Sequence, residues 1–86
     1  MWREEEMYMQ QLRQWLGERV PQYEGQWNIL PLSRGRYFVI PKPYPLVWGL
    51  CTIGSLVLAI PEAWAKEMEG DPTWNPIPNP LRSLPH

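Results

Sequence analysis

The sequence contains very little of the two residue types that most often cross-link a small fold. Among 86 residues there is one cysteine, Cys51, and one histidine, His86. A single thiol cannot form an internal disulfide, and one Cys with one His cannot supply the four ligands of a structural zinc site. Domains this short usually need a disulfide, a metal or association with something larger. Of these three, association is the option that remains.

A recognisable catalytic group is also lacking. Cys51 lies in an apolar run and the only histidine is the last residue, so no base accompanies a thiol or hydroxyl nucleophile. After Gly49 and Gly54 the chain continues with Ser55, where a phosphate-binding loop needs lysine. We therefore expect no enzyme activity, no catalytic residue, no small-molecule substrate, no metal site and no cofactor of its own.

An excess of charge of either sign is missing too. Eight Lys and Arg residues stand against nine Asp and Glu residues, which gives a net charge of −1. Such a balance provides no electrostatic surface for wrapping a nucleic acid, and we expect no nucleic-acid partner.

Proline and tryptophan, in contrast, are abundant. The chain has eleven prolines and six tryptophans, whereas proline makes up about 5% of an ordinary protein. So many prolines argue against a regular compact fold. We expect a mainly α, non-globular chain with four segments: an amphipathic helix, a short irregular hairpin, one transmembrane helix and an extended proline-rich tail.

Residues 1–20 have the pattern of an amphipathic docking helix. Tyr8, Leu12, Trp15 and Leu16 recur at the spacing that places side chains on one face of a helix. This face would dock on a partner or on the rest of the chain. A helix lying on a membrane surface is the alternative, although the glutamates near its start disfavour lipid binding.

Residues 21–42 read as an irregular segment with a hairpin in it. Two short runs rich in aromatic and branched residues flank Ser33, Arg34 and Gly35, and the glycine suits a tight turn.

Residues 43–65 form the segment that predicts a membrane span. From Pro43 to Pro61 there is no formal charge, and apolar residues lie on every side of a helical projection. A helix that is apolar all round is buried in a large core or in lipid, and a chain this short cannot enclose one. We therefore expect a single transmembrane helix. Burial of the run in a large soluble assembly stays open as the alternative.

The residues that flank this run agree with a span. Lys42 and Lys66 bracket a distance of roughly 36 Å along a helix, a little more than the hydrocarbon thickness of about 30 Å. Tyr44 and Trp48 at one end and Trp64 at the other suit the two head-group layers. Most Lys and Arg residues precede the run, which predicts an integral single-pass protein with its amino terminus on the cytoplasmic, matrix or stromal side.

Residues 66–86 read as an extended proline-rich segment. Its prolines exclude a helix and favour an extended path, while Trp74 and the nearby leucines would be poorly placed in open water. We expect a strap that lies along a partner surface, with a disordered tail as the alternative.

Together these segments predict a structural protein. The leading hypothesis is an accessory subunit of a large membrane complex, most plausibly one of respiratory or photosynthetic electron transfer, which stabilises assembly by clipping onto core subunits. Its partners would be those subunits and the lipid bilayer, with peripheral contact to lipid or pigment. The alternatives are a soluble cement or connector protein of a large assembly such as a virion, and a membrane-bound assembly factor.

The partner-contact residues predicted for this role are of two kinds. They are large aromatic anchors, which dominate interface energies, and small residues that admit a close neighbouring helix. The set is Trp15, Trp48, Gly49, Ser55, Ala59, Trp64 and Trp74.

Overall fold

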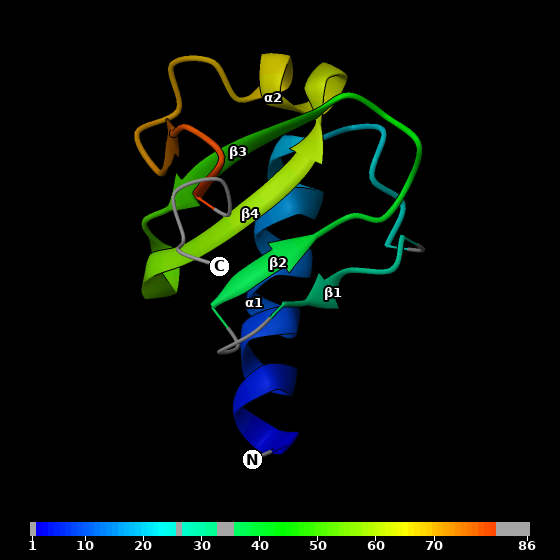
Figure 1. Cartoon of the computed structure of the whole chain (residues 1–86), viewed down its shortest axis with the longest axis vertical. Coiled ribbons are helices and arrows are strands. Elements are labelled where there is room, and N and C mark those ends of the chain that lie inside the picture. Colours follow the sequence, from blue (N-terminus) through cyan, green and yellow to red (C-terminus); the bar gives the residue numbers. More distant parts are fainter. Residues whose placement is uncertain (1, 26, 33–35, 81–86) are drawn as a thin grey trace.

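A long helix crosses one face of a five-stranded sheet in the computed structural model of this chain (Figure 1). The structure describes residues 2–25, 27–32 and 36–80. In chain order the elements are α1 (Trp2–Arg19), β1 (Leu30–Pro31), β2 (Tyr37–Val39), β3 (Leu46–Cys51), the short 3-10 helix η2 (Ile53–Ser55), β4 (Leu56–Pro61), α2 (Glu62–Glu67) and β5 (Trp74–Pro76).

The sheet is mixed, and its strands lie in the order β1-β2-β4-β3-β5. Only β2 and β4 run parallel, and the other neighbours are antiparallel. The longest pairing joins β3 to β4, from Leu46 opposite Pro61 to Cys51 opposite Leu56. The turn between them contains Gly54 with φ 75°, a backbone conformation that glycine adopts without steric cost.

The inner face of the sheet packs on α1. Side chains at alternate positions of β4 point to this face, because successive residues of a strand alternate between its two sides. The described part of the chain buries no polar or charged residue in its core. The buried side chains that meet between α1 and the sheet include Leu12, Trp15, Leu16, Val20, Phe38, Leu56, Leu58 and Ile60. Full burial of an aliphatic or aromatic side chain contributes about 1.5–3 kcal/mol to the free energy of unfolding.

The outer face of the sheet is apolar as well. Val57, Ala59 and Pro61 occupy the other set of alternate positions of β4, and their neighbours across the β3 pairing are Leu50, Trp48 and Leu46. Strands β3 and β4 are therefore hydrophobic on both sides, and their sequences show no polar alternation.

This two-sided character explains why the prediction of a transmembrane helix over 43–65 is wrong. The uncharged run is divided near its middle by Thr52 and η2 into two six-residue strands that pair with each other. Among the residues described, no helix has the length and apolar character needed to cross a bilayer. The expected integral single-pass localisation, and with it the orientation of the amino terminus, is contradicted.

The expected fold class, mainly α and non-globular, is also wrong. The chain is an α+β fold with a radius of gyration of 12.2 Å, close to the value of about 12 Å for a compact domain of this length. Residues 2–19 are helical where a helix is expected, and that helix packs on the chain's own sheet. The antiparallel pair β1–β2 flanks the expected hairpin turn, but Ser33, Arg34 and Gly35 lie outside the described residues.

The segment expected to be an extended strap has three different structures in its described part. The end of α2 comes first, then a turn, and then β5, which pairs with β3 from Trp74 opposite Cys51 to Pro76 opposite Gly49. The prolines between 72 and 80 are compatible with this because β5 is an edge strand, where a missing N–H leaves no ladder bond unmade. Residues 81–86 of the expected strap lie outside the described residues.

Substitution of Gly49 tests the closest contact of the fold. A Cβ built on Gly49 would overlap ring atoms of Trp74, so Gly49→Ala should lower the free energy of unfolding by about 1–3 kcal/mol. Gly17→Ala is the matched control, because its Cβ would have only Tyr23 within 4 Å, at 3.9 Å. That change in a helix interior should raise the free energy of unfolding by about 0.5–1 kcal/mol. Urea denaturation followed by tryptophan fluorescence measures both, and equal stability of the two variants would contradict the packing.

Candidate functional site

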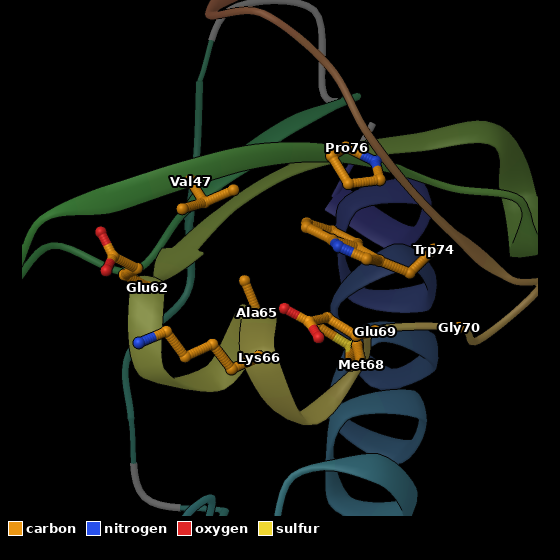
Figure 2. A pocket seen from close by; sticks show the side chains of 9 residues that line it. All are labelled: Val47, Glu62, Ala65, Lys66, Met68, Glu69, Gly70, Trp74 and Pro76. Atoms are coloured by element: carbon orange, nitrogen blue, oxygen red, sulfur yellow. The ribbon is translucent and has the colours of Figure 1, made fainter.

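A pocket opens between α2 and the two strands β3 and β5 (Figure 2). Its volume is about 430 Å³, within the range of about 300–1,000 Å³ for small-molecule sites. The lining comes from three separate parts of the chain that only the folded state brings together. The lining residues are Val47, Glu62, Ala65, Lys66, Met68, Glu69, Gly70, Trp74 and Pro76.

The walls and the mouth of this pocket differ in character. Apolar side chains from β3, α2 and β5 form the walls, with Val47 and Ala65 extending toward each other in Figure 2. The charged lining residues are Glu62, Lys66 and Glu69. Figure 2 shows Glu62 and Lys66 on one side of Ala65 and Glu69 on the other side, below Trp74, with the carboxylate of Glu69 extending toward Ala65. An apolar cavity with a few polar groups at fixed positions is the usual form of a ligand site.

Trp74 is the central residue of the pocket. Its side chain is 4% exposed, lies under Gly49 and packs against Trp15 with the ring centroids 5.9 Å apart. Within the described part of the chain, the indole Nε1–H of Trp74 has no hydrogen-bond acceptor. That nitrogen is not among the buried side-chain polar atoms that lack a hydrogen-bond partner. Figure 2 shows it on the edge of the ring that borders the pocket.

A polar cluster attaches the segment before Trp74 to α1. The Nε–H of Arg19 donates to Asp71 Oδ2 at 2.7 Å, and Asp71 Oδ1 accepts the backbone N–H and the hydroxyl of Thr73 at 2.8 and 2.6 Å. The hydroxyl oxygen of Thr73 in turn accepts the indole N–H of Trp15 at 2.9 Å. The hydrogen bonds from Thr73, and then that from Arg19, lower the pKa of Asp71. This cluster fixes the turn from which Trp74 enters the core.

A second hollow lies beside the ring of Trp27. It is lined by Gln22, Glu24, Trp27, Asn28 and Lys42. The ammonium of Lys42 is 5.2 Å from the centroid of the Trp27 ring, at the distance of a cation–π contact. Lys42 therefore already occupies a face of this ring, and the first pocket is the stronger candidate site.

The single thiol belongs to the core rather than to either hollow. Cys51 is buried, and this burial raises the pKa of its thiol. A protonated thiol is a poor nucleophile and a poor metal ligand. The described residues contain no group of three or more His, Cys, Asp or Glu side chains that could hold a metal ion.

The structure distributes the seven predicted contact residues over several places. The first group is buried between α1, α2 and the sheet: Trp15, Trp64 and Trp74. The second group lies on β3 and β4: Trp48 and Ala59 are buried on the outer face, and Gly49 lies against Trp74. Ser55 is exposed in the turn after β3. Contact of these residues with a partner stays a prediction.

Of these seven residues, only Trp74 lines the pocket. The sequence interpretation missed its charged residues, because Glu62, Lys66 and Glu69 resemble solvated charges that follow a membrane span. The spacing of four residues between Glu62 and Lys66 was a usable signal, since it places both on one side of a helix, whereas Glu69 lies in the turn after α2.

No known protein family, curated protein or solved structure matches this chain. Its own geometry therefore provides the grounds for a functional proposal.

The Asp71 cluster predicts a specific dependence of stability on pH. Because the folded state lowers the pKa of Asp71, this carboxylate stabilises the fold above the ordinary carboxyl pKa of about 4, and the stabilisation is lost as pH falls through the folded pKa. Asp71→Asn should lower the free energy of unfolding by about 1–2 kcal/mol at neutral pH and reduce its decline in acid. Urea denaturation between pH 7 and pH 2 measures both effects, and an unchanged acid profile in the variant would contradict this role.

Proposed function

We propose that this chain is a non-catalytic accessory component of a larger protein assembly, and that it docks through the outer face of its sheet. The outer face is defined here by the side chains opposite α1. By the strand register these are Leu30, Tyr37, Val39, Leu46, Trp48, Leu50, Val57, Ala59, Pro61 and Asn75.

The observation that supports this proposal is the composition of the outer face. When one side of a sheet packs on the core and the other faces water, polar residues usually alternate with apolar ones. Here the outer face has no charged residue, and its polar side-chain groups are the amide of Asn75 on the edge strand and the hydroxyl of Tyr37. Leu30 is 45% exposed and Leu46 37% exposed. Leu50 and Val57 are half-buried, whereas the residues between them and the rim, Trp48, Ala59 and Pro61, are buried. Partly exposed apolar residues without a charge among them are typical of an interaction site.

The edges of the sheet are less suitable for docking. Both edge strands contain a proline, Pro31 in β1 and Pro76 in β5. Proline has no N–H to donate to an added strand, and it is one of the devices by which proteins protect sheet edges. The face of the sheet therefore remains the favoured surface.

The occupant we propose is an uncharged, apolar surface of a different protein rather than a second copy of this chain. With strands about 4.8 Å apart and about 3.3 Å per residue, the outer face covers roughly 320 Å². A dimer through this face would bury roughly 640 Å² in total, below the usual 1,200–2,000 Å² of a stable complex. A larger partner can also cover the rim of the sheet and so reach a stable area.

This proposal keeps the accessory role expected from the sequence and leaves out the membrane span. A cement or connector role in a soluble particle would use the same face. The expected link to respiratory or photosynthetic electron transfer stays a prediction, and no contact among the described residues supports it.

Two charge substitutions test the outer face. Leu50→Glu places a carboxylate at a half-buried position of β3 on this face, while Met7→Glu places one on α1, where Met7 is 55% exposed on the opposite side of the sheet. In size-exclusion chromatography of lysate from the native cell, the wild type and Met7→Glu should elute with a large particle. Leu50→Glu should elute as a monomer because a charge at an interface costs several kcal/mol.

Circular dichroism of the purified variants checks that both are folded. The proposal is overturned if Leu50→Glu stays in the particle or if the wild type is monomeric in the lysate. It is equally overturned if the purified wild type alone forms a dimer that Leu50→Glu dissociates, because the occupant would then be a second copy.

A further inference from the structure

We further propose that the pocket between α2, β3 and β5 binds an apolar amino-acid residue with a free amino group, such as the amino-terminal residue of a peptide. The recognised chemistry is a primary ammonium group, a neighbouring carbonyl oxygen and an apolar side chain. This inference does not depend on the docking role of the outer face, because the pocket lies on the opposite side of the sheet.

The indole N–H of Trp74 supplies the first requirement. Trp74 is 4% exposed, yet its Nε1–H has no acceptor in the described part of the chain and borders the pocket (Figure 2). This nitrogen is not among the buried polar atoms that lack a partner, so it is accessible from the pocket and water can accept from it. A ligand that displaces this water leaves the N–H unpaired unless the ligand supplies an acceptor of its own, and an unpaired donor is costly. A carbonyl oxygen at this wall avoids that cost.

The charges of the pocket supply the second requirement. The charged lining residues are two glutamates, Glu62 and Glu69, and one lysine, Lys66, so the lining carries a net charge of −1. Figure 2 shows Glu69 below Trp74, so a negative charge lies in the part of the pocket near the indole. A cationic group on the ligand, close to its hydrogen-bond acceptor, would be complementary to this arrangement.

The remaining walls supply the third requirement. Val47, Ala65, Met68 and Pro76 offer no hydrogen-bonding side-chain group, and methionine adapts its shape to different apolar partners. The volume of about 430 Å³ is near the lower end for ligand sites. One apolar amino-acid residue with part of the next fits within such a space.

Other simple ligand classes satisfy only part of this pattern. An arginine side chain or a plain alkylamine provides the cation and an apolar stem but no acceptor for Trp74. A fatty acid or another anion provides the acceptor but would be repelled by Glu69. An amino-acid amide carries all three groups within a few bonds of one another.

Leucinamide is the probe that tests this assignment on the full-length chain. Titration followed by ¹⁵N–¹H correlation spectra should shift the Trp74 indole signal and saturate with a Kd of about 1 mM, as expected for so small a ligand. N-acetyl-leucinamide keeps the carbonyl and the side chain but has no positive charge, so it should bind at least tenfold more weakly. Equal binding of the two probes, or no binding of leucinamide, would overturn the proposal.

A third probe distinguishes the two sources of this chemistry. The tripeptide amide Leu-Gly-Gly should bind more tightly than leucinamide if the natural ligand is the amino terminus of a protein or peptide. Weaker binding of the tripeptide would identify a free amino-acid derivative instead. Either result supports the shared chemistry, provided that the acetylated control binds at least tenfold more weakly than leucinamide.

Three variants connect the binding to named atoms. Glu69→Gln should weaken leucinamide binding about tenfold by removing the charge, and Trp74→Phe should do so by removing the donor while keeping an aromatic ring. Glu67→Gln is the matched control, since Glu67 is an exposed carboxylate of α2 outside the pocket lining. The backbone signals of each variant report whether it folds. Undiminished binding by a folded Glu69→Gln variant would overturn the proposal, even if Trp74→Phe fails to fold.

Discussion

The pairing of β3 with β4 is the interaction on which the other strands depend. Each of these two strands has a further strand on its other side, since β2 pairs with β4 and β5 with β3. An isolated two-stranded hairpin is marginal in water. Helix α1 completes it by covering its inner face with buried leucine and tryptophan side chains. Loss of this hairpin would leave both α1 and the edge strands without a surface to pack on.

Aromatic packing replaces the cross-links that the chain lacks. Trp15 on α1 meets Trp74 on β5, which joins the first helix to the last described strand. On the other side of the core, Trp64 takes edge-to-face contacts from both Tyr23 and Trp27, with centroids 5.7 and 5.6 Å away. Such pairs contribute about 0.5–1.5 kcal/mol beyond their buried area. They connect segments far apart in sequence, as a disulfide would in a secreted domain of this size.

The two proposed binding surfaces have a common origin in this architecture. Helix α1 covers the inner face, and the partly exposed apolar side chains of the outer face, such as Leu30, Leu46 and Leu50, are those proposed to meet a partner. Because β5 begins at Trp74, its ring lies under Gly49, and the short helix α2 then leaves a pocket beside it. The Asp71 cluster holds the turn that positions Trp74. The pocket thus depends on how the segment after β4 returns to the sheet.

The sequence by itself determined the local features of this protein. The periodicity of Tyr8, Leu12, Trp15 and Leu16 predicted a helix with one buried face, and the helix lies at residues 2–19. The absence of a second cysteine excluded an internal disulfide whatever the fold. The hydrophobicity of the run from Pro43 to Pro61 indicated side chains that avoid water, and much of the run is buried in β3 and β4, although Tyr44, Leu46 and Ile53 are exposed. The transmembrane helix inferred from this run is wrong.

Only the tertiary structure decided what buries that run and which residues form the pocket. A continuous apolar run fits a lipid-embedded helix and a two-sided pair of strands equally well. The turn at Thr52 and Gly54 selects the strands, because it lets the two halves satisfy each other's backbone hydrogen bonds. The pocket joins Val47, Glu69 and Trp74, which are brought together by strand pairing and by the return of the chain after α2. Such contacts depend on the register between distant segments, which hydrophobic spacing along one segment does not encode.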